Sequence, residues 1–388
     1  MFDDRTRPTS WCCQCDFTPG TMIGAVAASL LAAAIATAAP SGRTTGTSGV
    51  SQQPLSRSMS GAAPNAPATE PVISQDGRIA RYAAYTSAAT NIRPGTSGRR
   101  NVYLVKRSGG SSGSPWTIGS TVLASAGIGG QPANGDSFSP ALDGAARGDS
   151  ARGPSCVAFV SAASNLVGGD NNGQADVFVR KLSSGGLKRI PSPAGKPASD
   201  VGVSGTCKAI VYVAGSSLYV KRGARAPKKV ASGSISSPRS TFNGVGLSYA
   251  KGGSIYAGSI SGNVRKVASG AGPAPDGGDT GSRSKGKVRY VSYERGGSVY
   301  YRRLGGFGRR LSVGTGARPT AGGGQVIFGS GPFVYLYALS NNFGKQAPQG
   351  FCPAGGGDVT QTYPSGRGNY IVFSCSGGGV YLSYVVAK

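Results

Sequence analysis

The chain has 388 residues, which allows one large all-β domain or two ordinary ones. Glycine makes up 65 of the 388 residues, about 17% against the usual ~7%, which favours many tight turns. The chain has no His, which excludes Ser-His-Asp catalysis and histidine metal sites. The 41 Lys and Arg against 15 Asp and Glu give a net charge of +26, which predicts attraction to polyanions, although a general Arg bias would also produce it.

The N-terminal residues predict an export signal. Residues 22–39 (MIGAVAASLLAAAIATAA) carry no charge and contain Ala36-Thr37-Ala38, an A-x-A pattern of the kind that signal peptidase cuts. We expect cleavage after Ala38 or Ala39. An uncleaved membrane anchor is the alternative, because these 18 residues just reach the thickness of a bilayer. Residues 1–21 lack a positive n-region, so Met22 or another codon is a candidate for the true start. We therefore assign residues 1–39 to the signal.

Residues 40–53 are rich in Ser, Thr and Gly and predict a flexible linker. The chain that follows repeats one strand pattern, in which an apolar residue and usually an aromatic one are often followed by basic residues. Five of the six steps between successive copies, at 35 to 46 residues, are close to the ~40–50-residue period of a propeller blade. The copies are residues 102–107, 177–182, 218–223, 255–260, 299–304, 334–339 and 380–385.

Other strands surround each copy. A strand with alternating apolar residues precedes it, a third element often follows it, and a fourth, with an Asp-Gly turn, precedes the pair. The sequence therefore predicts an all-β fold: a seven-bladed β-propeller of four-stranded blades over residues 54–388. The long step between the first two copies is assigned to longer loops. A strand near Leu55–Met59 is expected to complete the last blade and close the ring.

One blade carries a family resemblance. Residues 161–180 (SAASNLVGGDNNGQADVFVR), with Ser-x-Asp-Gly at 74–77 in the preceding blade, resemble the TolB-like or WD-like bacterial propeller repeats. The resemblance is strongest over 137–190 and covers most of 54–388. It implies an exported, multi-bladed scaffold that binds other proteins. Related propellers include enzymes, so the resemblance does not fix an activity.

The loop DNNGQAD within that blade is a candidate calcium site. Asp170, Asn172 and Asp176 offer oxygen atoms at spaced positions around a turn, which suits a hard cation. The equivalent loop of the first blade carries Thr96 and Asn101 in place of the two Asp residues, so a metal is not a requirement of the repeat. We favour the alternative, a hairpin turn in which Asp and Asn cap the backbone. No other cofactor is predicted.

Four cysteines follow the signal: Cys156, Cys207, Cys352 and Cys375. An even number in an exported protein is compatible with two disulfides. Cys352 and Cys375 are close in sequence, which favours that pair and leaves Cys156 to pair with Cys207. Free buried thiols are the alternative.

Basic pairs recur at the end of the repeated strand and predict a belt of charge at the outer rim that would hold an anionic polymer. The alternative is solvated turns that protect sheet edges from aggregation. A second basic set, at 188–189, 228–229, 265–266 and 309–310, follows the next turn. The candidate polyanion contacts are Lys106, Arg107, Arg180, Lys181, Lys221, Arg222, Arg302 and Arg303.

Asp76, Asp143, Asp200 and Asp276 lie near equivalent ends of inner strands, where they would ring one channel mouth. Asp-Gly turn chemistry explains most of them. Our leading hypothesis is thus an exported, non-enzymatic scaffold of the periplasm, cell surface or extracellular space. We expect it to be monomeric, to bind another envelope or extracellular protein, and to touch a membrane only if the signal stays uncleaved. The alternatives are a binder of anionic polymers and a propeller hydrolase or lyase that uses the channel carboxylates.

Overall fold

The structure is a computed structural model. It describes residues 44–45, 51–76, 79–109, 116–144, 153–241, 244–276, 287–306, 308–312, 320–322, 325–338, 348–365 and 369–384. The predicted export signal lies outside these residues. Within them, no helix combines the length and the apolar character needed to cross a membrane.

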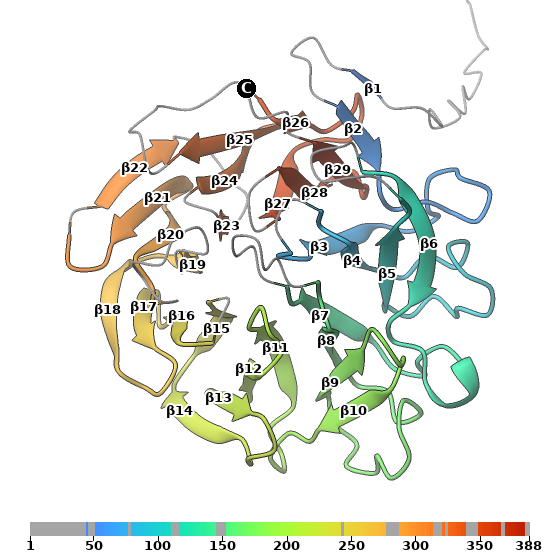
Figure 1. The fold of residues 1–388 in the computed structure, drawn as a ribbon, viewed down its shortest axis with the longest axis horizontal. Helices are drawn as coiled ribbons and strands as arrows, with labels where there is room; N and C mark the ends of the chain where they lie inside the picture. Colours follow the sequence, from blue (N-terminus) through green and yellow to red (C-terminus); the bar gives the residue numbers. More distant parts are fainter. Residues whose placement is uncertain are drawn as a thin grey trace, which may run out of the picture. The chain divides into compact units, whose positions relative to one another are not determined.

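Seven antiparallel sheets surround a centre, each running from an inner to an outer strand (Figure 1). The predicted seven-bladed propeller is confirmed. The first three blades follow the chain in order, with a short 3-10 turn, η1 (Ile128–Gly130), between the first two. They are blade A, with β3 (Ala68–Ile73), β4 (Tyr82–Ser87), β5 (Asn101–Arg107) and β6 (Ile118–Leu123); blade B, with β7 (Ser137–Leu142), β8 (Cys156–Ser161), β9 (Asp176–Lys181) and β10 (Leu187–Ile190); and blade C, with β11 (Ala198–Val203), β12 (Ala209–Ala214), β13 (Ser217–Arg222) and β14 (Lys228–Ser232).

The remaining blades repeat the same order, and the last one borrows its outer strands from the N-terminal side of the propeller. They are blade D, with β15 (Ile235–Ser240), β16 (Gly246–Lys251), β17 (Ser254–Ser259) and β18 (Val264–Ser269); blade E, with β19 (Ala271–Asp276), β20 (Tyr290–Arg295), β21 (Ser298–Arg303) and β22 (Gly308–Ser312); blade F, with β23 (Thr320–Gly322), β24 (Gln325–Ser330), β25 (Phe333–Ala338) and β26 (Gly350–Phe351); and blade G, with β27 (Val359–Pro364), β28 (Tyr370–Cys375), β29 (Val380–Tyr384), β2 (Ser51–Pro54) and β1 (Thr44–Thr45).

Ring closure uses an earlier segment than the sequence predicts. β2 pairs antiparallel with β29, from Ser51 opposite Tyr384 to Pro54 opposite Tyr381, so the closing strand lies mostly within the predicted linker. Leu55, expected in that strand, is instead a buried residue just after it. The polar Gln52 belongs in the strand because its amide exchanges two hydrogen bonds of 2.9 and 3.0 Å with the backbone of Phe351 in blade F.

Each blade carries a pair of aromatic rings on its two middle strands. In blades A to D the ring centroids are 5.3 to 5.8 Å apart and the planes nearly parallel, because directly opposed residues of antiparallel strands share a face. Blades E, F and G continue the pattern. The pairs are Tyr85–Tyr103, Phe159–Phe178, Tyr212–Tyr219, Tyr249–Tyr256, Tyr293–Tyr300, Phe328–Tyr335 and Phe373–Tyr381.

Two-residue glycine turns set the register of several of these hairpins. Lys251 and Ser254 are opposed across Gly252-Gly253, whose φ angles are 53° and 69°. Gly296-Gly297 joins β20 to β21 in the same way, with φ angles of 54° and 70°. Positive φ at both central residues matches the twist of a hairpin, and glycine adopts it without a Cβ clash.

Both favoured disulfides are present, and each joins two neighbouring blades. Cys156 at the start of β8 bonds Cys207 in the β11–β12 turn, with Cα atoms 6.2 Å apart. Cys352 just after β26 bonds Cys375 at the end of β28, with Cα atoms 5.8 Å apart. The disulfides therefore link blade B to blade C and blade F to blade G, junctions that the sheet hydrogen bonds do not cross.

Candidate functional site

A cavity of about 410 Å³ lies among the innermost strands, and the described residues that line it come from six of the seven blades. These strands surround the centre of the ring in Figure 1. The propeller architecture explains this position, because every blade turns its first strand toward the axis. Polar residues that line the cavity include Glu70, Ser139, Ser199, Asp200, Ser237, Arg239, Glu294 and Gln361.

Backbone bulges shape the cavity wall. In blades A, B and D the strand register breaks at Glu70, Ser139 and Ser237, whose φ angles are 53°, 51° and 52°. A proline follows each of them, and blade E has Gly272-Pro273 at the same place. Proline lacks the N–H that a regular ladder would use, which suits a bulge. A non-glycine residue at positive φ costs on the order of 1–3 kcal/mol, and such strain concentrates at functional sites.

Two carboxylates tie these bulges together across the blades. Glu70 Oε2 accepts hydrogen bonds from the Thr86 hydroxyl at 2.7 Å and from the Ser139 backbone N–H at 2.8 Å. Its side chain therefore connects blade A to blade B at the cavity wall. A carboxylate fixed by donors from two blades is preorganised, since its position no longer depends on one flexible side chain.

Asp200 of blade C holds both neighbouring blades. It accepts hydrogen bonds from the Ser139 hydroxyl of blade B at 2.6 Å and from the Ser237 backbone N–H of blade D at 3.1 Å. Arg239, also on blade D, lies 3.5 Å from its Oδ1. Three carboxylates, Glu70, Asp200 and Glu294, and one guanidinium, Arg239, thus line the cavity. The cavity is acidic within a chain of net charge +26.

The predicted ring of aspartates is only partly correct. Asp200 lines the cavity, but Asp76 and Asp143 are buried in the turns after β3 and β7. Asp76 accepts hydrogen bonds from the backbone of Arg81 and pairs with its guanidinium at 2.9 Å. The side chain of Asp276 lies outside the described residues. The turn aspartates cap their own hairpins, which removes them from the channel surface.

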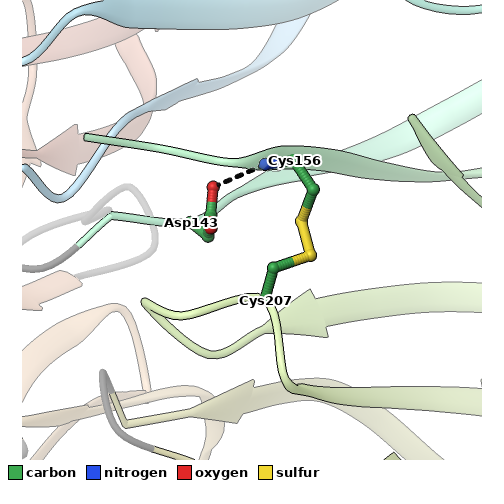
Figure 2. Close-up of side chains that lie close together, drawn as sticks. All are labelled: Asp143, Cys156 and Cys207. Atoms are coloured by element: carbon green, nitrogen blue, oxygen red, sulfur yellow. Dashed lines mark hydrogen bonds between the residues drawn. A yellow bond between two sulfur atoms is a disulfide. The ribbon is translucent and has the colours of Figure 1, made fainter. Parts of the chain in front are cut away.

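Asp143 makes the second such cap, beside the first disulfide (Figure 2). Its carboxylate accepts hydrogen bonds from the Ser155 N–H, the Ser155 hydroxyl and the Cys156 N–H, at 2.7, 2.6 and 2.9 Å. Burial nevertheless raises the pKa of Asp143 above its ordinary value. Asp143, Cys156 and Cys207 have ligand atoms within 4.8 Å of one another. Both sulfurs are in the disulfide, so they are not thiolate ligands for a metal.

The candidate calcium residues come together, but around an arginine. Arg189 of β10 forms an ion pair with Asp170 and lies 3.6 Å from Asp176. Asn172 donates its side-chain N–H to Asp176 at 2.9 Å, and the Ser192 backbone N–H donates to the other Asp176 oxygen at 2.6 Å. Calcium at this loop would have to displace the guanidinium, so the arrangement fits the capped turn better than the metal site.

The predicted polyanion contacts include residues that contact neighbouring blades and residues that are exposed to solvent. Arg107 is buried, which contradicts its role as a surface contact: the register shift before it turns the side chain inward, where it donates to the Tyr370 hydroxyl of blade G at 3.0 Å. Arg180 and Arg302 occupy equivalent positions and fasten neighbouring blades. Arg180 donates to the carbonyl of Ala124 at 2.7 Å, and burial lowers its pKa.

Arg302 donates to the carbonyl of Val267 in the preceding blade at 2.6 Å. Lys221 donates to Gly223 in its own turn at 2.6 Å, and Arg222 donates to Gly244 of the next blade at 2.7 Å. Arg180, Arg222 and Arg302 therefore also hold neighbouring blades together, a role that the prediction of surface charge does not include. The exposed members of the set are Lys106, Lys181, Arg222, Arg302 and Arg303.

Sequence reasoning does not find most of the cavity residues. Glu70, Ser139, Ser237, Arg239 and Glu294 belong to none of the predicted sites. One signal is present, because a three-residue segment ending in proline recurs in the innermost strand as TEP, FSP, SSP and AGP. Proline inside a strand marks a bulge or an edge, so this recurrence locates the cavity wall. Comparison of the chain with known family models and with curated proteins finds no match.

Proposed function

We propose that the chain is an exported, non-enzymatic scaffold that binds another envelope or extracellular protein at the channel cavity. The acidic cavity is the observation that carries this proposal. Glu70, Asp200 and Glu294 line it although acids are scarce in the chain, and the first two are fixed by hydrogen bonds from neighbouring blades. Rigid, strained backbone around a polar cavity is typical of a recognition site.

The size and charge of the cavity indicate what part of a partner would enter. About 410 Å³ accommodates one or two side chains or a short loop, and not a whole domain. Among the described residues that line it, three carboxylates stand against one guanidinium, so the cavity favours a Lys or Arg side chain. The proposed ligand is therefore a cationic segment that projects from the surface of another protein.

Export is supported by two features of the chain. Residues 22–39 have the apolar run and the A-x-A pattern of a signal peptide. Two disulfides join the blades, and such bonds persist in oxidising compartments outside the cytosol. Detection of the mature chain in periplasmic or culture fractions tests this part of the proposal, and retention of residues 22–39 in the mature chain would favour a membrane anchor.

A blocked cavity tests the binding site. Ser199 is exposed on the cavity wall, so Ser199→Trp fills the cavity without removing either carboxylate. Ser183→Trp, in the exposed β9–β10 turn, is the matched control. We expect proteins cross-linked to the purified chain in envelope extract to fall at least tenfold with Ser199→Trp and to persist with Ser183→Trp. Equal recovery with both variants would overturn the proposal.

A screen of glycan and peptide hydrolysis tests the non-enzymatic part. We expect no turnover by the chain. Turnover that Asp200→Asn abolishes, with the same thermal midpoint, would instead favour the hydrolase or lyase alternative.

A further inference from the structure

The positive charge of the chain is concentrated in three adjacent blades. Residues 198–312 contain 19 Lys and Arg but only four acids, whereas residues 51–197 contain 15 Lys and Arg and seven acids. The first segment spans blades C, D and E, and its outer strands β14, β18 and β22 follow one another along one side of the ring (Figure 1).

The outer strands present cations at one repeated register position. Lys229 is opposed to Tyr219, Lys266 to Tyr256 and Arg310 to Tyr300. Each preceding residue is also basic, and all six side chains are exposed. We call these six residues the basic rim: Lys228, Lys229, Arg265, Lys266, Arg309 and Arg310.

The two members of each pair flank opposite sides of their blade. The tyrosine face of a blade packs against the preceding blade, since Tyr293 shares a buried cluster with Ile255 and Ala257 of blade D. The other member turns toward the following blade, because Arg309 donates to the Tyr337 hydroxyl of blade F at 3.2 Å.

Adjacent blades therefore place cations on both sides of one junction. Arg265 agrees with this arrangement, since its guanidinium lies 3.5 Å from the place of a Cβ at Gly305 in blade E. Lys228 and Lys266 flank the C–D junction, and Arg265 and Arg310 flank the D–E junction. Successive junctions thus offer successive anion positions along the rim.

The charge of the basic rim is not neutralised by ion pairs within the described part of the chain. The ion pairs found there involve Arg81, Arg100, Arg189 and Arg239. Arg189 is informative, because it is opposed to Phe178 in blade B at the same register position as Lys229, Lys266 and Arg310. Blade B supplies Asp170 and Asp176 to that cation, and the sequence of blades C and D from residue 201 to 275 contains no acid at all.

The surroundings of Tyr300 report the local potential. The Arg295 guanidinium lies over its ring, 4.6 Å from the centroid. The hydrogen bond and the charge of Arg295, and after them the charge of Arg310, lower the pKa of Tyr300 below its ordinary value. The D–E junction thus stabilises a negative charge on an oxygen atom at the surface.

We propose that the basic rim of blades C, D and E binds a linear polymer whose repeated charges are phosphates. Cations repeated along a curved edge match phosphates repeated along a flexible chain, and releasing counterions from that chain drives binding. Arg265, Arg309 and Arg310 add the planar guanidinium geometry that suits phosphate oxygens.

Charge spacing, rather than base stacking, carries the recognition. Tyr219, Tyr256 and Tyr300 are each flanked by a partner ring on one neighbouring strand and by a rim cation on the other. Proteins that bind single-stranded nucleic acid usually offer open aromatic faces to the bases. The basic rim lacks this feature among the described tyrosines, which favours a polymer without bases. This site is separate from the channel cavity and does not depend on it.

Binding of labelled inorganic polyphosphate to the full chain tests the proposal. Lys228→Gln, Arg265→Gln, Lys266→Gln and Arg310→Gln together should weaken binding at least tenfold. The slope of log affinity against log salt should also fall by about 0.7 for each phosphate that the variant no longer neutralises. The control removes four exposed charges from blades A and B, by Arg99→Gln, Lys106→Gln, Lys181→Gln and Lys188→Gln. We expect the control to change the affinity less than about twofold.

Three outcomes would overturn the proposal. Equal losses in the two quadruple variants would mean that net charge alone attracts the polymer. Failure of the unaltered chain to bind polyphosphate at low salt would exclude the site. Tighter binding of oligo(dT) than of polyphosphate with an equal number of phosphates would identify a nucleic-acid site instead.

If the quadruple variant has a lowered thermal midpoint, the single variant Lys266→Gln replaces it. This variant should weaken polyphosphate binding about twofold to threefold, and unchanged binding would count against the site. Ser199→Trp should leave polyphosphate binding unchanged, so the two proposals fail separately.

Discussion

Blade B and blade D place a cation at the same register position and surround it differently. In blade B, Arg189 keeps 21% of its side chain exposed and faces the buried carboxylates Asp170 and Asp176. In blade D, Lys266 is exposed and lies in a stretch of chain that contains no acid. The same β-framework therefore gives a structural ion pair in one blade and an uncompensated surface charge in another. The blade framework sets the position of the cation, and the carboxylates of the neighbouring loop determine whether it forms an ion pair.

The largest effect should come from removing the disulfide that joins blade B to blade C. Cys156→Ser with Cys207→Ser removes a disulfide across 51 residues, for which loop closure predicts a loss of about 4 kcal/mol in the free energy of unfolding. Denaturant unfolding under oxidising conditions measures it. Cys352→Ser with Cys375→Ser, across 23 residues, should cost about 3 kcal/mol. A loss under about 1 kcal/mol in both variants would mean that packing alone holds the blades.

Removing the cation tests the comparison directly. Arg189→Gln leaves Asp170 and Asp176 together without their counter-charge, so we expect a loss of about 2 kcal/mol in unfolding free energy. Lys266→Gln, at the equivalent exposed position, should change it by less than about 0.5 kcal/mol. Similar losses in the two variants would show that the cation of blade D is also structural.

The pH dependence of stability should reveal the buried turn of blade B. Burial raises the pKa of Asp143, so the folded chain holds this proton more tightly than the unfolded chain. The stability from Asp143 is fully present below the ordinary pKa of 3.8 and is lost as the pH rises through the raised value. Asp143→Asn should flatten this fall in a pH series of thermal midpoints. An unchanged slope in the variant would assign the fall to other groups.

A smaller effect should appear in the pKa of Tyr300, at the junction of blades D and E. Arg295 and Arg310 lower the pKa of Tyr300, so this tyrosine should lose its proton before the buried tyrosines, whose pKa values burial raises, such as Tyr293. An NMR titration of the tyrosine rings measures the order. Arg310→Gln should raise the pKa of Tyr300 slightly, and Arg295→Gln should raise it more. Tyr300 titrating together with Tyr293 would count against a positive D–E junction.

Calcium should have the smallest effect of all. Because Arg189 already stands between Asp170 and Asp176, we expect the thermal midpoint to be the same with calcium and with a chelator. A rise of several degrees with calcium, abolished in Asp170→Asn, would restore the metal site that the loop sequence permits.

Periodic features and the two disulfide pairings were predictable from the sequence, and the noncovalent contacts between blades were not. Alternating apolar residues and Gly-rich turns located the strand pairs, because strand periodicity and turn chemistry are local. The closing strand was displaced to Ser51–Pro54, since Gln52 finds its partner in blade F, 299 residues away. Arg107 shows the same limit: its partner Tyr370 lies on blade G, so no local pattern marks it as buried. The cavity was missed because its residues come from six blades.

Covalent lysine labelling with and without polyphosphate tests most directly whether the blades differ in function. We expect Lys228, Lys229 and Lys266 to lose reactivity when the polymer is bound, and Lys106, Lys181 and Lys188, which are also exposed, to keep theirs. Equal protection of the two sets, or protection of blades A and B alone, would contradict it.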